Sequence, residues 1–228
     1  MVLVVAVPDS YVGLGASDSG EPGPAEQAPA CSDPPLEMIK HPLQHRWSLW
    51  FYKNDKNRSW EENLLEITSF DTVEDFWALY NHIEVASKLP LGCDYSLFKY
   101  GIKPMWEDCR NKQGGRWLFN LNKSQRTTDL DNYWLEILLC LIGEGFDEFS
   151  DDVNGAVVQI RPKLDKIAVW TADVRRADGN IKIGQIMKAE PCSACGPLQQ
   201  ARRNGGVEDI EGEVKHAPPK HCSIPGPC

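Results

Sequence analysis

Long hydrophobic runs are missing from this 228-residue sequence. No stretch approaches the roughly 18 consecutive apolar residues that a membrane-spanning helix needs, so the sequence predicts no membrane segment. The apolar opening, residues 1–7, has no basic residue before it and stops at Pro8. It is therefore too short and wrongly flanked for a secretory signal, and we expect it to begin a disordered extension.

An excess of positive charge is also missing. The chain has 24 Lys and Arg against 33 Asp and Glu, which gives a net charge of −9 and a pI near 5.1. A protein that coats RNA or DNA through bulk electrostatics needs the opposite balance. If this chain binds nucleic acid, a small local site must supply the attraction.

The eight cysteines lack the spacing of a disulfide framework. Without a secretory signal, reduced thiols in the cytosol are the better interpretation. Residues near the C-terminus have the types found in zinc sites, namely Cys192, Cys195, His216, His221, Cys222 and Cys228. Their spacing is irregular compared with the tight pairs of structural zinc sites, so we predict no metal.

A catalytic constellation is not recognisable either. The five histidines show no Ser-His-Asp spacing, and no Gly-rich phosphate loop occurs. The adjacent Glu61 and Glu62 suit a charged strand entry better than a general acid and base. The sequence therefore predicts a protein that is not an enzyme and uses no cofactor.

Composition divides the chain into three parts. Residues 1–38 are rich in Pro, Gly, Ser and Ala and are predicted to be disordered. Residues 39–189 carry periodic apolar patterns and form the predicted folded domain. Residues 190–228 return to Pro, Gly, Cys and charge, and are predicted to be a disordered tail.

The folded part alternates between strand and helix patterns. Apolar alternation predicts six strands at residues 46–53, 63–69, 94–100, 116–121, 155–161 and 166–172. Helical spacing predicts three helices, one up to about Ser87 with Asp71 as its N-cap, one over 124–142 and one over 175–189. Antiparallel strands interleaved with helices indicate an α+β fold, with the helices on one face of a sheet.

Tryptophan is abundant, with eight residues. Dense apolar surroundings predict core positions for Trp47, Trp50, Trp117 and Trp134. Trp60 and Trp106 instead lie in polar loops, where an indole is poorly placed for a core. Two such side chains could close on a flat ligand from both sides, although packing as core residues is the alternative.

Several long segments resemble one known family, the eukaryotic translation initiation factor 4E family of messenger RNA cap-binding proteins. The resemblance covers about residues 39–188 and rests on HPLQHRWSLWF, FDTVEDFWALYNHI, GCDYSLF, PMWED, GGRWLFNL, LDNYWLEILLCLIGE and GAVVQIRPKLDKIAVWT. It implies a curved antiparallel sheet with about three helices on its convex face and a cap pocket on its concave face. Residues 39–189 would then be the cap-binding domain.

The resemblance also implies roles for individual residues. Methylation at N7 makes guanine a delocalised cation, which indole faces attract; Trp60 and Trp106 match the family's sandwich around that base. Glu107 matches the carboxylate that reads the guanine edge, and Trp170 the indole near the N7-methyl group. The cap triphosphate would be bound by Arg116, Arg161, Lys163 and Lys166.

A second surface is implied on the back of the domain. It matches the site that binds a helix of the initiation scaffold 4G or of 4E-binding repressors. The matching residues are His41, Pro42, Val73, Trp77, Leu135, Glu136 and Gly143. The implied function is cap binding with 4G recruitment by a monomer in the cytoplasm, with the nucleus or RNA granules as further locations. The alternative is a repressor or interaction protein that sequesters 4G or capped RNA.

The sequence departs from the family pattern after Lys188. The family continues with a short closing strand and a loop that covers the cap phosphates. Residues 189–228 show neither pattern. We therefore expect the sheet to lack its last strand and the phosphates to lose part of their cover.

Overall fold

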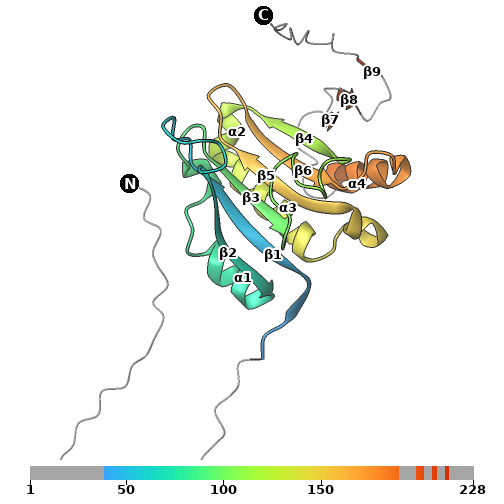
Figure 1. Ribbon diagram of the computed structural model, residues 1–228, viewed down its shortest axis with the longest axis horizontal. Coiled ribbons are helices and arrows are strands. Elements are labelled where there is room, and N and C mark those ends of the chain that lie inside the picture. The colour runs from blue at the N-terminus through green and yellow to red at the C-terminus, as the bar shows by residue number, and fades with distance from the viewer. Residues whose placement is uncertain (1–38, 190–198, 203–206, 210–213, 216–228) are drawn as a thin grey trace, which may run out of the picture.

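The computed structural model describes residues 39–189 and the short segments 199–202, 207–209 and 214–215. Its centre is one curved antiparallel sheet (Figure 1). Six long strands form most of the sheet: β1 (Pro42–Tyr52), β2 (Leu64–Thr72), β3 (Asp94–Lys99), β4 (Gly115–Leu121), β5 (Val153–Gln159) and β6 (Asp165–Thr171). They lie in the order β2-β1-β3-β5-β6-β4. The predicted α+β class and all six predicted strands are confirmed.

Four helices accompany the sheet in the described part of the chain. They are α1 (Val73–Tyr80), α2 (Lys123–Thr128), α3 (Leu130–Ile142) and α4 (Ala177–Ala189), with short 3-10 turns at Ala86–Lys88 and Asp147–Asp152. α3 supplies the largest helical share of the core through Trp134, Ile137, Leu138 and Leu141. These side chains pack on the convex face of the sheet, so that face is covered.

Strand alternation separates the sheet into two faces. On β1, the side chains of Trp47, Leu49 and Phe51 pack against those of the helices and form part of the main core, the larger of the two apolar clusters. The other face carries a smaller apolar cluster of Phe98, Ile102, Leu118, Val157, Ala168 and Trp170. We call this second face, opposite the helices, the open face.

Three of the four predicted core tryptophans behave as expected. Trp47, Trp117 and Trp134 are almost fully buried in the main core. Trp50 is the exception: it alternates with Leu49 and Phe51 on β1, is half-buried, and pairs with Ser96. Because side chains on a strand alternate between its two faces, Trp50 lies on the open face and not in the main core. The apolar residues around it in the sequence do not indicate which face it occupies.

The helix boundaries differ from the prediction in two places. The N-cap of α1 is Thr72, whose hydroxyl accepts a 3.2 Å hydrogen bond from the Asp75 amide; Asp71 is exposed one residue earlier. The single helix predicted over 124–142 is divided at Asp129, whose backbone leaves helical geometry at φ −123° and ψ −29°. Periodicity alone does not detect a break of one residue.

The C-terminal part of the chain also differs from expectation. A short strand, β7 (Gln199–Arg202), pairs with the outer edge of β4, and β8 (Val207–Asp209) and β9 (Val214–Lys215) follow it. The expectation that no closing strand follows α4 is therefore wrong. The other residues of the predicted tail lie outside the described residues, and so do residues 1–38 of the predicted extension.

Candidate functional site

Antiparallel pairing aligns open-face side chains of five strands in transverse rows. The first row is Tyr52, Asp94, Gln159, Lys166 and Asn120. The second is Trp50, Ser96, Val157, Ala168 and Leu118, and the third is Ser48, Phe98, Gly155, Trp170 and Arg116. The open face thus changes from polar in the first row to aromatic and cationic in the third.

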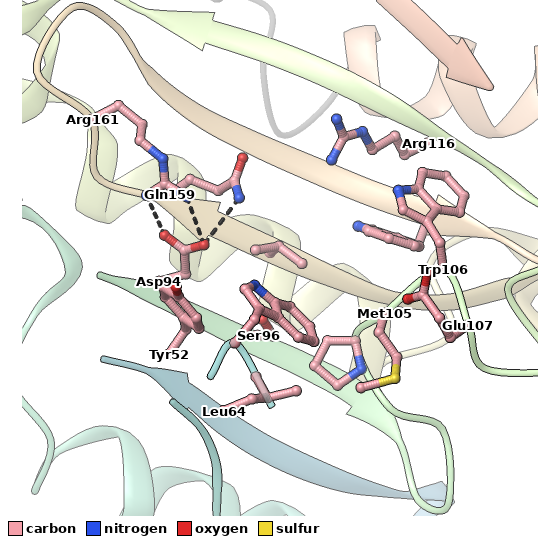
Figure 2. Close-up of a pocket in the computed structure, with 14 residues that line it drawn as sticks. Tyr52, Leu64, Asp94, Ser96, Met105, Trp106, Glu107, Arg116, Gln159 and Arg161 are labelled. Carbon is pink, nitrogen blue, oxygen red and sulfur yellow. Dashed lines mark hydrogen bonds and ion pairs between the residues drawn. The ribbon is translucent and has the colours of Figure 1, made fainter. Parts of the chain in front are cut away.

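Two loops rise over these rows and close a cavity of about 350 Å³. The Trp60 loop (residues 53–63) follows β1, and the Trp106 loop (residues 101–114) follows β3. The cavity is lined by Tyr52, Trp60, Leu64, Asp94, Ser96, Pro104, Met105, Trp106, Glu107, Arg116, Val157, Gln159, Arg161 and Trp170. Figure 2 shows Trp106, Glu107 and Arg116 at one end and Asp94, Gln159 and Arg161 at the other.

The first end is an aromatic group that already contacts a cation. The rings of Trp106 and Trp170 lie 4.0 Å apart between centroids, at an interplanar angle of 37°. The guanidinium carbon of Arg116 lies 5.8 Å from the centre of each ring. Burial lowers the pKa of Arg116 below its ordinary value. Indole faces attract a delocalised cation in this geometry, so this end suits a flat, positively charged ligand.

The second end is a hydrogen-bonded ion pair. The Arg161 guanidinium donates to both oxygens of Asp94, one of them at 2.8 Å. Gln159 donates to the same carboxylate at 3.0 Å. The hydrogen bond with Asp94 raises the pKa of Arg161 above its ordinary value. Arg161 therefore lies in the cavity as predicted, but its charge is shared with a carboxylate that the sequence did not reveal.

Trp60 sits on a compact turn. Ser59 and Glu62 bond reciprocally: the Glu62 amide donates to the Ser59 hydroxyl at 3.2 Å, and the Ser59 amide donates to the Glu62 carboxylate at 2.8 Å. The Trp60 side chain is 45% exposed, and its ring lies 5.9 Å from that of Tyr52. The indole is thus exposed at the cavity wall, which agrees with the prediction that it is not a core residue.

The Trp106 loop is fixed from inside by polar side chains. Asp108 accepts hydrogen bonds from the amides of Lys103 at 3.0 Å and Arg110 at 2.9 Å. The buried Asn111 donates to the carbonyls of Lys103 and Met105. Sequence reasoning missed Asn111, because an asparagine in a polar loop gives no sign that it is buried.

The remaining predicted cations, Lys163 and Lys166, do not line the cavity. Lys163 is exposed in the turn between β5 and β6, and Lys166 lies half-buried in the polar row beside Gln159. Arg126 of α2 fixes this turn through hydrogen bonds of 2.5 Å to both oxygens of the buried Asp165. Lys163 therefore lies in the turn that follows Arg161, and Lys166 lies beside the Arg161 end of the cavity without lining it.

The predicted partner surface gathers at the start of α1 and along α3. His41 is bonded to Glu74 by its backbone amide at 2.9 Å and by its ring at 2.6 Å, and its carbonyl accepts from the Val73 amide at 2.9 Å. These contacts join the start of β1 to α1. Trp77 is 37% exposed on α1.

The predicted α3 positions of the partner surface differ in exposure. Leu135 is half-buried, whereas Glu136 and Gly143 are exposed, as is Pro42 at the start of β1. Partial burial raises the pKa of Glu136 above its ordinary value. The predicted partner residues therefore include an exposed indole on α1 and apolar and acidic side chains on α3.

Comparison with known proteins identifies the family. The sequence profile described as eukaryotic initiation factor 4E matches residues 42–191, which is most of the folded part of the chain. The chain belongs to the eukaryotic initiation factor 4E family.

Relatives in this family are closely similar over the same region. The chain is 64% identical over 152 residues to the zebrafish (Danio rerio) eukaryotic translation initiation factor 4E-1A, covering 67% of this chain and 71% of the relative. It is 63% identical over 154 residues to the human eukaryotic translation initiation factor 4E, covering 68% and 71%. To the human type 1B protein it is 62% identical over 153 residues, covering 67% and 63%.

Solved structures of initiation factors 4E share the fold. The Ascaris suum factor 4E-3 in complex with an m2,2,7G cap is 47% identical, with a TM-score of 0.71, and the match covers 75% of this chain and 97% of that one. The C. elegans factor 4E-3 in complex with the 4E-binding protein Mextli and a cap analog is 51% identical, with a TM-score of 0.67, covering 71% and 92%. The schistosome factor 4E complexed with m7GpppA and 4E-BP is 32% identical, with a TM-score of 0.67, covering 76% and 90%.

Two other features are absent from the described part of this family member. Residues 39–189 and the short C-terminal strands contain no helix long and apolar enough to span a bilayer. The same residues hold no group of three or more His, Cys, Asp or Glu placed to bind a metal ion. The candidate zinc residues lie outside the described residues.

Proposed function

We propose that this chain binds the 7-methylguanosine cap of messenger RNA in the open-face cavity. The observation that carries the proposal is the aromatic end of that cavity. There a planar, delocalised cation, the Arg116 guanidinium, already lies 5.8 Å from both Trp106 and Trp170. N7-methylated guanine is also flat and cationic, so it suits the same environment, whereas unmethylated guanine lacks the charge.

The base is held by indoles and read by a carboxylate. Trp60 and Trp106 stand on separate loops that line one cavity. To hold a base between them, Trp106 exchanges its 4.0 Å contact with Trp170 for contact with the base. Glu107 accepts from the N1–H and amino group of guanine, which adenine does not offer together. Trp170 faces the N7-methyl side.

The triphosphate extends toward the Arg161 end of the cavity. Arg116 and Arg161 line the cavity itself, and Lys163 and Lys166 extend the positive charge beyond it. Arg161 must share its guanidinium between Asp94 and phosphate. Such contacts are charge-assisted, so the affinity for the triphosphate should fall as salt rises.

We also propose that the chain binds a helix of the scaffold 4G or of a 4E-binding protein on its convex back. An exposed tryptophan on a helix is a frequent anchor of protein interfaces, and Trp77 has this form. Solved relatives occur in complexes with a 4E-binding protein. The proposed contact residues are His41, Pro42, Val73, Trp77, Leu135, Glu136 and Gly143.

The proposal includes several broader properties. The chain acts as a monomeric binding module in translation initiation rather than as an enzyme, and it works in the cytoplasm. Residues 39–189 form the cap-binding unit, flanked by an N-terminal extension and a C-terminal tail.

One experiment with two variants tests both surfaces. The full chain should be retained on immobilised 7-methyl-GTP and eluted by free 7-methyl-GTP but not by GTP. Trp106→Ala should lose retention because one face of the clamp is removed. Trp77→Ala should be retained while failing to co-elute a 4G-derived helical peptide.

The outcomes separate the alternatives. If the full chain is not retained, cap binding is rejected, and the repressor or interaction role through Trp77 remains. If Trp106→Ala is retained as well as the full chain, the assigned clamp is wrong. Loss of retention in Trp77→Ala would show that the two surfaces are not separable.

A further inference from the structure

We propose that Asn154, acting through Asn111, is a positioning residue that holds Trp106 and Glu107 in place for cap binding. Both asparagines have 0% exposure. They form a continuous set of hydrogen bonds from β5, at the floor of the open face, to the backbone directly before Trp106. The inference rests on the proposed cap-binding function, because it assigns a role within that site.

Asn154 sits where β5 departs from regular pairing. Val153 pairs with Thr171 and Gly155 pairs with Trp170, so Asn154 is an extra residue opposite adjacent partners on β6. Such a bulge redirects a side chain out of the regular alternation. Here it directs the Asn154 amide into the Trp106 loop, one residue from the partner of Trp170.

The donors and acceptors determine which way both amides face. The Asn154 nitrogen donates to the carbonyl of Arg110 at 2.8 Å and to the side-chain oxygen of Asn111 at 2.9 Å. The Asn111 nitrogen in turn donates to the carbonyls of Lys103 at 2.8 Å and Met105 at 2.9 Å. Carbonyl oxygens only accept hydrogen bonds. The side-chain nitrogen of each asparagine must therefore face its carbonyl partners. This leaves the side-chain oxygen of Asn111 to accept the hydrogen bond from Asn154.

These hydrogen bonds hold the part of the loop that carries Trp106 and Glu107. Met105 immediately precedes Trp106 and Glu107, and Lys103 and Arg110 lie on either side of them. Loss of the Asn154 amide leaves the Arg110 carbonyl and the Asn111 oxygen without that donor inside the protein, where water cannot readily replace it. The loop should then sample other positions, and a clamp that is not preorganised binds more weakly.

The test compares Asn154→Ala with Asn180→Ala. Asn180 lies on α4 and is also buried. Its side-chain amide likewise donates two hydrogen bonds, at 2.8 Å to the carbonyl of Asp173 and at 2.9 Å to the carbonyl of Arg176. Asn154→Ala should bind 7-methyl-GTP about tenfold more weakly, as expected when buried acceptors lose a hydrogen-bond donor, and Asn180→Ala should bind it normally. Asn111→Ala should weaken binding at least as much, because Asn111 donates directly to the carbonyls of Lys103 and Met105. The losses should be less than additive in the double variant Asn111→Ala with Asn154→Ala, because both single variants remove the shared hydrogen bond between the two side chains.

Hydrogen exchange supplies a readout that does not depend on ligand. The amides of Lys103 and of residues 105–110 should exchange faster in Asn154→Ala than in the wild-type chain, and should be unchanged in Asn180→Ala. Equal exchange and equal cap affinity in the two variants would overturn the positioning role. If the wild-type chain does not bind 7-methyl-GTP, the proposed function fails, and the exchange comparison alone still supports or overturns the control of the loop by Asn154.

Discussion

At the scale of single residues, the cavity brings together side chains that are far apart in sequence. Arg161 is a predicted phosphate contact, yet its strongest partner in the structure is Asp94. The two are 67 residues apart and meet only because β3 pairs with β5, which places Asp94 beside Gln159. No local pattern in the sequence reveals such a pair, whereas Trp60 and Trp106 stood out because each is a lone indole in a polar loop.

The Asp94 carboxylate gives a prediction for this end of the cavity. Asp94→Asn keeps the shape of the side chain and removes a negative charge close to the proposed triphosphate. A like charge about 4 Å away near a protein surface costs on the order of 1–4 kcal/mol. With screening and solvent exposure we expect the low end of this range, which makes 7-methyl-GTP bind about fivefold more tightly. Calorimetric titration of both proteins measures the difference.

The nucleoside supplies the control. 7-Methylguanosine has no phosphate, so its affinity should be the same for Asp94→Asn and the wild-type chain. Weaker binding of 7-methyl-GTP by the variant would contradict the charge argument. It would indicate that Asp94 serves mainly to orient Arg161.

At the scale of elements, periodicity predicts which segments form strands and helices but not where each helix starts. The sequence pattern predicts Asp71 as the N-cap of the first helix, whereas the cap in the structure is Thr72, and both residue types can cap. The choice depends on backbone direction: Thr72 ends β2 in an extended conformation, at φ −130° and ψ 157°, which aims its hydroxyl at the Asp75 amide. A tertiary constraint of this kind is not visible in the sequence.

The cap of α1 can be tested by a matched pair. Thr72→Ala should lower the free energy of unfolding by about 1 kcal/mol, as loss of a helix cap usually does. Because α1 carries Val73 and Trp77, the variant should also lose more affinity for a 4G-derived peptide than for cap. Urea denaturation and peptide titration measure the two effects. Asp71→Ala should leave both nearly unchanged, and an equal loss in the two variants would mean that Thr72 is not the determining cap.

At the scale of the whole molecule, a chain with a net charge of −9 contains a site proposed to bind an anion. The two facts are compatible because charges beyond about 8 Å are largely screened at physiological salt. Arg116 and Arg161 line the cavity itself, so the local cations determine the binding. Overall charge excluded a protein that coats nucleic acid, but it could not locate a site of this size.

The edge of the sheet offers the last test at this scale. β7 pairs with β4 in the register Gly115↔Arg202, Arg116↔Ala201, Trp117↔Gln200 and Leu118↔Gln199. It therefore covers the backbone of the strand that carries Arg116. An uncovered edge of this kind loses hydrogen bonds and can pair with other chains. A chain ended at Pro191 exposes that edge, whereas a chain ended at Arg202 keeps β7 and removes only residues 203–228, which include β8 and β9.

We expect the chain ended at Pro191 to be less stable than the one ended at Arg202. Each backbone hydrogen bond contributes about 1 kcal/mol, and the entropy of ordering four residues offsets much of the total. A net loss of about 1–2 kcal/mol lowers the melting temperature by roughly 2–8 °C in a domain of this size. Calorimetry measures the shift, and light scattering measures aggregation of the shorter chain. Equal melting temperatures would mean that β7 contributes nothing to the stability of the sheet and that the long strands alone hold β4 in place.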